Sequence, residues 1–128
     1  MTPVNQIDDL NRKLDRLTMD PDNAELYNTI GTILCQVKDW GNAEHYLRRA
    51  YALNPSDRGI LYNYAGILYL RQKYRKAASV CRAGLKLDPT DPGLLEKLSD
   101  ICYLQGEYEE AAKAYTILRK PSDKVGVL

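Results

Sequence analysis

The chain repeats itself with a period of 34 residues. Pro21, Pro55 and Pro89 lie at this spacing, and Asn54-Pro55 returns as Asp88-Pro89. The same period relates small residues (Gly31, Ala65, Ser99), alanines (Ala43, Ala77, Ala111), aromatic residues (Trp40, Tyr74, Tyr108) and large apolar residues (Ile30, Tyr64, Leu98 and Leu34, Leu68, Cys102). Such a period indicates units that are too small to fold alone and that must stack on one another.

Each copy of the repeat predicts two helices. In the first copy, apolar residues follow helical spacing over residues 24–37, residues 38–41 interrupt the pattern, and a second helix covers residues 42–53. Pro55 ends that helix, because proline lacks an amide donor and disfavours helix in the residue before it. The later copies predict helices at 58–72, 75–87, 92–105 and 108–120.

The small residues that recur in each copy have a packing explanation. A bulky side chain at Gly31 or Ala43, or at their equivalents, would push the two helices of a pair apart. Tyr64, Tyr74 and Tyr108 fall at positions that we expect in the core.

Both ends of the chain depart from the repeat. Residues 4–19 predict a helix with an apolar seam of Ile7, Leu10, Leu14 and Leu17. We expect it to cap the first repeat, and the alternative is a free helix offered to a partner. Residues 121–128 predict a frayed tail that is too short to cap the other end. The face of Ala114, Ile117 and Leu118 is therefore expected to stay partly open for self-association or for a partner.

The pattern resembles the tetratricopeptide repeat family. The family's order of aromatic residue, Leu-Gly, aromatic residue, alanine, alanine and proline stands in the first copy as Tyr27, Ile30-Gly31, Leu34, Ala43, Ala50 and Pro55. The copies cover residues 24–57, 58–91 and 92–120. In the third copy Leu118 replaces an alanine and Pro121 arrives two residues early, so the last helix is predicted to be short. The resemblance implies an all-α, right-handed superhelical stack of about seven helices.

The resemblance also implies a binding groove on the concave side, lined by the first helix of each pair. At the family's ligand-contacting places this chain carries, among others, Asn28, Thr32, Tyr62, Asn63, Tyr69, Lys97, Asp100 and Tyr103. Amide and hydroxyl side chains can pair with the backbone of an extended peptide, and tyrosine is enriched in binding hot spots. Asn63 is the strongest candidate, because asparagine at its place commonly holds ligand backbone in the family.

One specificity of the family is not predicted here. Its clamp for the acidic C-termini of heat-shock chaperones needs two lysines, two asparagines and an arginine. Those places hold Asn28, Thr32, Asn63, Gly93 and Lys97, so only Asn63 matches fully. Glu96 and Asp100 form an acidic rim instead, which favours a ligand carrying Lys or Arg.

Composition excludes several other classes of function. The net charge of +1 leaves no basic stripe for nucleic acid, and no apolar run approaches the ~20 residues that span a bilayer. Cys35, Cys81 and Cys102 lack metal-site spacing and are expected as small buried hydrophobes. The only histidine, His45, is expected on the surface. Free thiols without an export signal predict a cytoplasmic protein.

We therefore expect a module that binds a protein or peptide in its groove, as an adaptor, scaffold or chaperone-like protein. The alternative is a structural unit that assembles with copies of itself through its ends. No nucleophile–base pair, metal-ligand set or cofactor loop is found in the sequence, so no enzyme, metal or cofactor is predicted.

Overall fold

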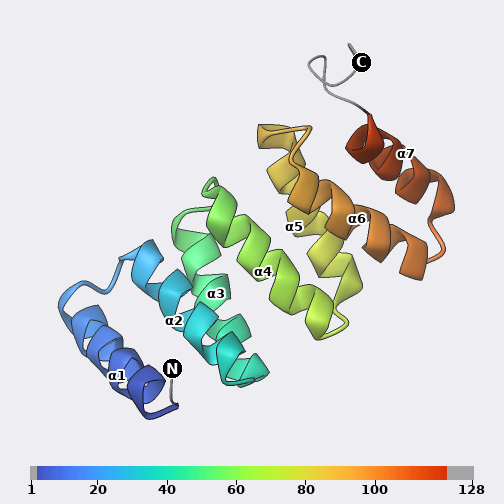
Figure 1. Ribbon diagram of the computed structural model, residues 1–128. Helices are drawn as coiled ribbons and strands as arrows, with labels where there is room; N and C mark the ends of the chain where they lie inside the picture. Colours follow the sequence, from blue (N-terminus) through green and yellow to red (C-terminus); the bar gives the residue numbers. More distant parts are fainter. Residues whose placement is uncertain (1–2, 121–128) are drawn as a thin grey trace, which may run out of the picture.

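The computed structural model describes residues 3–120, which form seven helices and no strand (Figure 1). In chain order they are α1 (Pro3–Met19), α2 (Ala24–Gln36), α3 (Trp40–Leu53), α4 (Arg58–Leu70), α5 (Tyr74–Leu87), α6 (Pro92–Leu104) and α7 (Tyr108–Arg119). The prediction of an all-α fold is confirmed. The tail predicted at residues 121–128 lies outside the described residues.

The first helix of each pair begins at a side-chain cap. Asn23, Asp57 and Asp91 precede α2, α4 and α6, and each side chain accepts a hydrogen bond from a backbone N–H three residues later, at 3.0, 3.0 and 3.2 Å. These bonds satisfy an amide that the helix itself leaves unpaired. The 34-residue period thus includes a start signal for every pair.

The same helices end at residues with left-handed backbone. These are Lys38 (φ 63°), Gln72 (φ 61°) and Gly106 (φ 78°). The next amide in each case donates to a carbonyl five residues earlier, as from Asp39 to Leu34 at 2.8 Å, which closes a Schellman turn. Because the reversal is complete at this turn, α3 begins at Trp40, and the prediction that placed Trp40 and Gly41 in a loop is wrong.

The two helices of a pair approach closely at the small residues. A Cβ atom built on Gly31 would lie 2.6 Å from Cγ of Leu47, a buried α3 side chain. In the third pair the small residue is Ser99, whose hydroxyl donates to the carbonyl of Ala111 at 3.3 Å. The packing reason given for the small positions therefore holds in the structure.

The pairs stack in chain order, with α1 at one end and α7 at the other (Figure 1). Neighbouring helices contact one another throughout the described chain, and α2 also contacts α4, as α4 contacts α6. The second helices of the pairs are α3, α5 and α7. Within residues 3–120, no Cα atom of one of them lies within 8 Å of a Cα atom of another. The first helices thus lie on the inner side of the curve.

The ends of the stack differ. At the first end α1 packs on α2, and Leu10, Leu14 and Leu17 are partly buried against the core, while Ile7 is exposed. At the other end α7 has 12 residues where α3 and α5 have 14, so the prediction of a short last helix is confirmed. No helix within residues 3–120 is both long and apolar enough to cross a bilayer.

Candidate functional site

The inner side of the stack is hollowed between α2, α4 and α6. A cavity of about 400 Å³ opens there, and we call it the central groove. Its lining is Thr32, Cys35, Leu47, Tyr62, Asn63, Gly66, Ile67, Tyr69, Leu70 and Lys97. Five of the eight predicted groove residues, Thr32, Tyr62, Asn63, Tyr69 and Lys97, therefore lie around one cavity.

Asn63 connects two helices of the central groove. Its Nδ2 donates to Oδ1 of Asn28 at 3.1 Å, which joins α4 to α2. Each amide side chain has further donor or acceptor capacity beyond this one bond. Thr32 is already engaged, because its hydroxyl donates to the backbone carbonyl of Asn28 at 2.9 Å. The bond between Asn63 and Asn28 thus links α4 to α2 beside the groove.

Lys97 lies across two aromatic rings. Its Nζ stands 4.6 Å from the ring centre of Tyr62 and 5.9 Å from that of Tyr69. Lys97 also lies over Gly66, where a Cβ atom would be in ordinary contact with it, 3.8 Å from both Cε and Nζ. The quadrupole of an aromatic ring attracts a cation in this geometry. The groove floor therefore carries the positive charge of Lys97, a residue of α6 that packs against the rings of α4.

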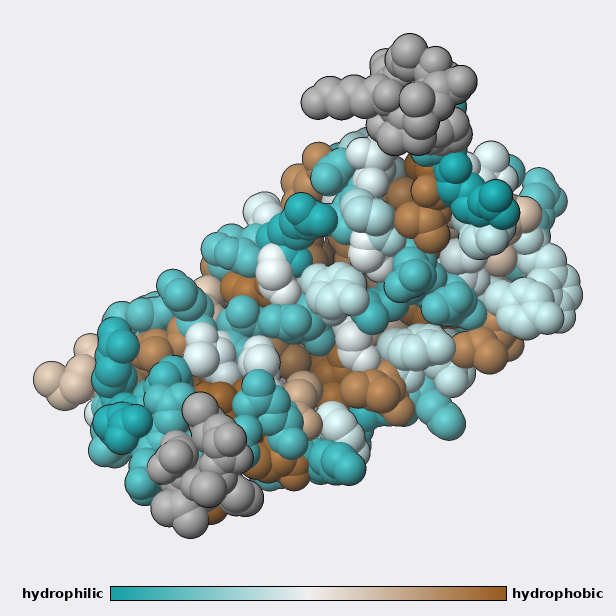
Figure 2. Space-filling model, in the orientation of Figure 1, coloured by the Kyte–Doolittle hydropathy of each residue, from teal (hydrophilic) through white to brown (hydrophobic). Residues whose placement is uncertain are grey.

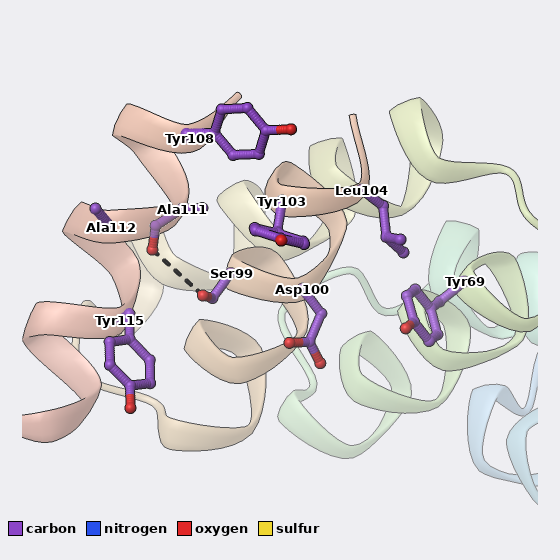
Figure 3. A pocket seen from close by; sticks show the side chains of 9 residues that line it. All are labelled: Tyr69, Ser99, Asp100, Tyr103, Leu104, Tyr108, Ala111, Ala112 and Tyr115. Atoms are coloured by element: carbon purple, nitrogen blue, oxygen red, sulfur yellow. Dashed lines mark hydrogen bonds between the residues drawn. The ribbon is translucent and has the colours of Figure 1, made fainter. Parts of the chain in front are cut away.

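A second hollow opens between α6 and α7, with a volume of about 730 Å³ (Figure 3). We call it the end cleft, and its lining is Tyr69, Ser99, Asp100, Tyr103, Leu104, Tyr108, Ala111, Ala112 and Tyr115. The predicted groove residues Asp100 and Tyr103 lie here, and Tyr69 borders both hollows. Tyr103 and Tyr108 stand edge to face, with ring centres 5.3 Å apart.

The end cleft includes residues that were not predicted from the sequence as binding residues. Tyr108, expected in the core, is 62% exposed, and Tyr115 is half exposed. Both lie on α7, on the side that no further helix covers within the described residues. The 34-residue period contained a signal for Tyr108, because Tyr74 and Trp40 occupy the equivalent place one and two copies earlier.

The three residues predicted at the open end of α7 differ in exposure. Ala114 is buried, and Leu118 is half-buried against the core. Only Ile117 is substantially exposed, at 44%. Ala114 thus belongs to the packing of α7 on α6, because its side chain points inward.

On the face in Figure 2, brown hydrophobic residues appear between teal hydrophilic ones and form no continuous band. A surface of this kind offers mixed polar and aromatic contacts instead of one large apolar patch.

A buried carboxylate joins the first two pairs. Glu44 on α3 is 2% exposed and accepts hydrogen bonds from Arg71 and Lys73, both at 2.8 Å. Burial alone would raise the pKa of this carboxyl, but the bonds and charges of Lys73 and Arg71 outweigh burial and hold the pKa below its usual value. Asp91 is equally buried and pairs with Arg58 while it caps α6.

Two of the three cysteines are buried thiols. Cys81 and Cys102 are buried as expected, whereas Cys35 is only half-buried. Burial raises the pKa of Cys81 to about 12. Cys102 lies with Glu107 and Glu110 in a group whose ligand atoms fall within 4.8 Å, but Arg82 already binds both oxygens of Glu110 at 2.8 Å. The ion pair accounts for this cluster. His45 is exposed, as predicted.

Comparison with known proteins agrees with the architecture. A sequence profile of the family described as "Anaphase-promoting complex, cyclosome, subunit 3" matches residues 36–117, more than half of the chain. No curated protein sequence matches the chain.

Solved structures share the fold. A crystal structure of MamA has a TM-score of 0.80 at 17% identity, over 85% of this chain and 64% of that one. A second MamA crystal structure gives 0.79 at 17% identity, over 85% and 60%. PilF of Pseudomonas aeruginosa gives 0.73 at 23% identity, over 84% and 50%. The chain thus spans less than two thirds of these proteins, and at such identities the likeness shows the fold alone.

Proposed function

Since the chain belongs to the family described as anaphase-promoting complex, cyclosome, subunit 3, whose repeats are of the tetratricopeptide type, we propose that it is a protein–protein interaction module. In this proposal a peptide or protein segment lies in the central groove. The chain then acts as an adaptor, a scaffold or a chaperone-like protein, and its role is binding and not catalysis.

The observation that carries the proposal is the lining of the central groove. Tyrosine rings, a bonded pair of amides and one ammonium group come together there from three successive first helices. Amides can pair with the backbone of an extended segment, and tyrosine gives large contact area at low entropic cost. The site is also held by packed helices, which keeps its geometry ready before a ligand arrives.

A selection from random 16-residue peptides displayed on phage tests this proposal. The full chain is immobilised, and the dissociation constants of the selected peptides are measured by fluorescence anisotropy. Tyr62→Ala and Asn63→Ala should each weaken binding about tenfold, a loss typical of a hot spot. Asn63→Ala should cost only about 1 kcal/mol of stability, because it removes one partly buried hydrogen bond.

The matched control is His45→Ala, on an exposed site of α3 away from the central groove. It should leave both binding and melting temperature unchanged. Binding that survives both groove substitutions, or that falls only in step with thermal stability, would refute a groove-bound segment.

The second candidate function is assembly of the chain with copies of itself. Exposed Ile117 on the last described helix favours it. Ile117→Glu should abolish oligomers while the circular dichroism spectrum stays unchanged. A light-scattering series of the wild type that stays monomeric at all concentrations would remove this candidate.

A further inference from the structure

The end cleft lies on the side of the third pair where one more helix could pack. We call the corresponding surface of each pair its seat. The equivalent seat on the first pair is filled by α4, and the one on the second pair by α6. Leu47 on α3 and its equivalent Cys81 on α5 are consequently buried, at 1% and 0% exposure, whereas Tyr115 on α7 is 50% exposed. Likewise Ala78 is buried, and its equivalent Ala112 is exposed. Within residues 3–120 the third seat has no helix in it.

The two filled seats show how such a helix is held. When α6 sits on the second pair, Leu94 fills the space above Gly84, and Lys97 lies over Gly66 between the rings of Tyr62 and Tyr69. When α4 sits on the first pair, Asn63 occupies the place of Lys97 and bonds to Asn28, the equivalent of Tyr62. In both filled seats, therefore, the same residue of the incoming helix contacts the place that Tyr62 and Asn28 occupy in the pair beneath it.

In the third seat, the residues equivalent to those around Lys97 are acidic and aromatic. The equivalents of Tyr62, Gly66 and Tyr69 are Glu96, Asp100 and Tyr103. Figure 3 shows the Asp100 side chain in the end cleft, which Tyr103 also lines. Among the described residues, neither Glu96 nor Asp100 has a cationic side chain within 4.0 Å. A cation on the incoming helix would meet the Asp100 carboxylate and an aromatic ring, with Glu96 one helical turn before Asp100 on α6.

The distribution of charge along the chain also favours a basic helix in the third seat. Residues 92–110 carry acidic side chains at Glu96, Asp100, Glu107, Glu109 and Glu110 and one basic side chain, Lys97. Residues 58–76, which cover the first pair, carry basic side chains only: Arg58, Arg71, Lys73, Arg75 and Lys76. Two of these bind the buried Glu44. The first interface thus already pairs a basic incoming element with a carboxylate of the pair beneath it.

We propose that the end cleft binds an amphipathic helix of another protein, and that a lysine or arginine of this helix lies against Glu96, Asp100 and Tyr103. The apolar side of the helix covers Ala111, Ala112 and Tyr115. The proposal rests on the proposed function in that the ligand is a protein, but it names a different hollow and a folded helix in place of an extended segment.

The test uses a library based on α6. The segment Pro92–Leu104 is displayed on one helix of a stable helical hairpin, because isolated helices of this length are marginal in water. The residue equivalent to Lys97 is fully randomised. The apolar positions vary among small and large side chains, because Tyr115 stands where the other seats have Leu47 and Cys81. The immobilised full chain selects binders, and anisotropy gives their dissociation constants.

Lysine or arginine should dominate at the randomised position. E96K/D100K should weaken the selected binders by at least about tenfold, and a new selection on that variant should enrich glutamate or aspartate. The control D8K/E25K changes the net charge equally at exposed sites far from the end cleft and should bind as the wild type does. Circular dichroism melting checks that every variant is folded.

The outcomes separate the two proposals. Helix binding that withstands Asn63→Ala, together with failure of the extended peptides, supports the end cleft and refutes the central groove. No enrichment of basic residues, or equal binding to E96K/D100K, refutes the basic helix. If sedimentation shows that the chain dimerises without any peptide and that E96K/D100K abolishes the dimer, the occupant is a second copy and the proposal is wrong.

Discussion

Two of the three left-handed turn residues carry side chains that strain the backbone. Lys38 and Gln72 adopt φ values of 63° and 61°, where the equivalent third position has Gly106. For a residue with a Cβ atom this conformation costs roughly 1–2 kcal/mol.

Lys38→Gly and Gln72→Gly should therefore raise the free energy of unfolding. We expect about 0.5–1 kcal/mol for each, because the relief of strain exceeds the extra backbone entropy of glycine. Gly106→Ala should lower stability by about 1 kcal/mol for the same reason. Urea denaturation measures all three. Gln36→Gly, in right-handed helix, is the control and should destabilise; a loss of stability in Lys38→Gly would contradict the account.

Glu44 makes stability depend on acid pH. The pKa of its carboxyl is lower in the folded than in the unfolded state, so its contribution is complete above the unfolded value of about 4.3 and is lost as the pH falls through the folded value. Glu44→Gln should cost about 1–3 kcal/mol at pH 7, because two charge-assisted bonds weaken. The difference from wild type should shrink at pH 3.

Urea denaturation at both pH values checks this prediction. Glu109→Gln is the control, because the Glu109 side chain is 89% exposed and should contribute little at either pH. A wild type and a Glu44→Gln variant that differ equally at pH 7 and pH 3 would show that the carboxylate is not responsible.

The burial of Glu44 could not be predicted from the sequence. Apolar spacing indicates which face of α3 is buried, but it assigns a charged residue such as Glu44 to the surface. Its partners come from the turn between α4 and α5, 27 and 29 residues later, so no local pattern reports the contact. The period held a weaker signal, since Glu44 has the small residues Ala78 and Ala112 as its equivalents.

Between the two helices of a pair, the closest approach at a glycine lies at Gly31. Its added Cβ would meet Leu47 at 2.6 Å from Cγ and 2.8 Å from Cδ2, near the branch point of a fully packed side chain. Gly31→Ala should therefore destabilise by about 1–3 kcal/mol, more than the gain of up to about 1 kcal/mol in helix propensity.

Gly41→Ala is the matched control for Gly31→Ala. A Cβ atom on Gly41 would meet nothing within 4 Å, so this helix-opening residue should be neutral or slightly stabilising. Thermal melting followed by circular dichroism compares the two variants. Equal melting temperatures for both would mean that α2 and α3 separate without cost.

The charges between pairs also fix their order. In the first interface the acid, Glu44, lies on the earlier pair and its bases on the later one. In the second interface the base, Arg82, lies on the earlier pair and the acid, Glu110, on the later one. Exchanging the pairs would break both matches, so these contacts contribute to specificity as well as to stability.

For the whole molecule, stability should be highest in the middle. The pair α4–α5 has packed neighbours on both sides, whereas α1 and α7 have them on one side only within the described chain. In a linear array each unit is stabilised by its nearest neighbours. Amides of α1 and α7 should therefore exchange with deuterium at least about tenfold faster than those of α4.

Hydrogen exchange followed by mass spectrometry tests this gradient. Leu68→Ala, which opens the buried centre, should speed exchange in α4 and also in both flanking pairs. Equal protection in α1, α4 and α7 would instead show that the array unfolds as a single cooperative unit.

Most of the fold could be read from the sequence, but less of the candidate site. The period, the prolines and the small residues indicated the six helices of the repeats, because each of these signals acts within one copy, and the apolar seam indicated α1. The cleft at α7 exists because no further helix packs there within the described residues. The contact of Lys97 with Tyr62 depends on the angle between two pairs. Both arise from stacking, which no single copy encodes.

Lys97 gives this protein a thermodynamic linkage between ligand and scaffold. The ammonium that is available to a partner is the one that holds α6 over the rings of α4. A ligand carboxylate that drew it off the rings would loosen the contact between the second and third pairs. Affinity for acidic segments would then fall as the array is made stiffer, and such segments would widen the groove in which they lie.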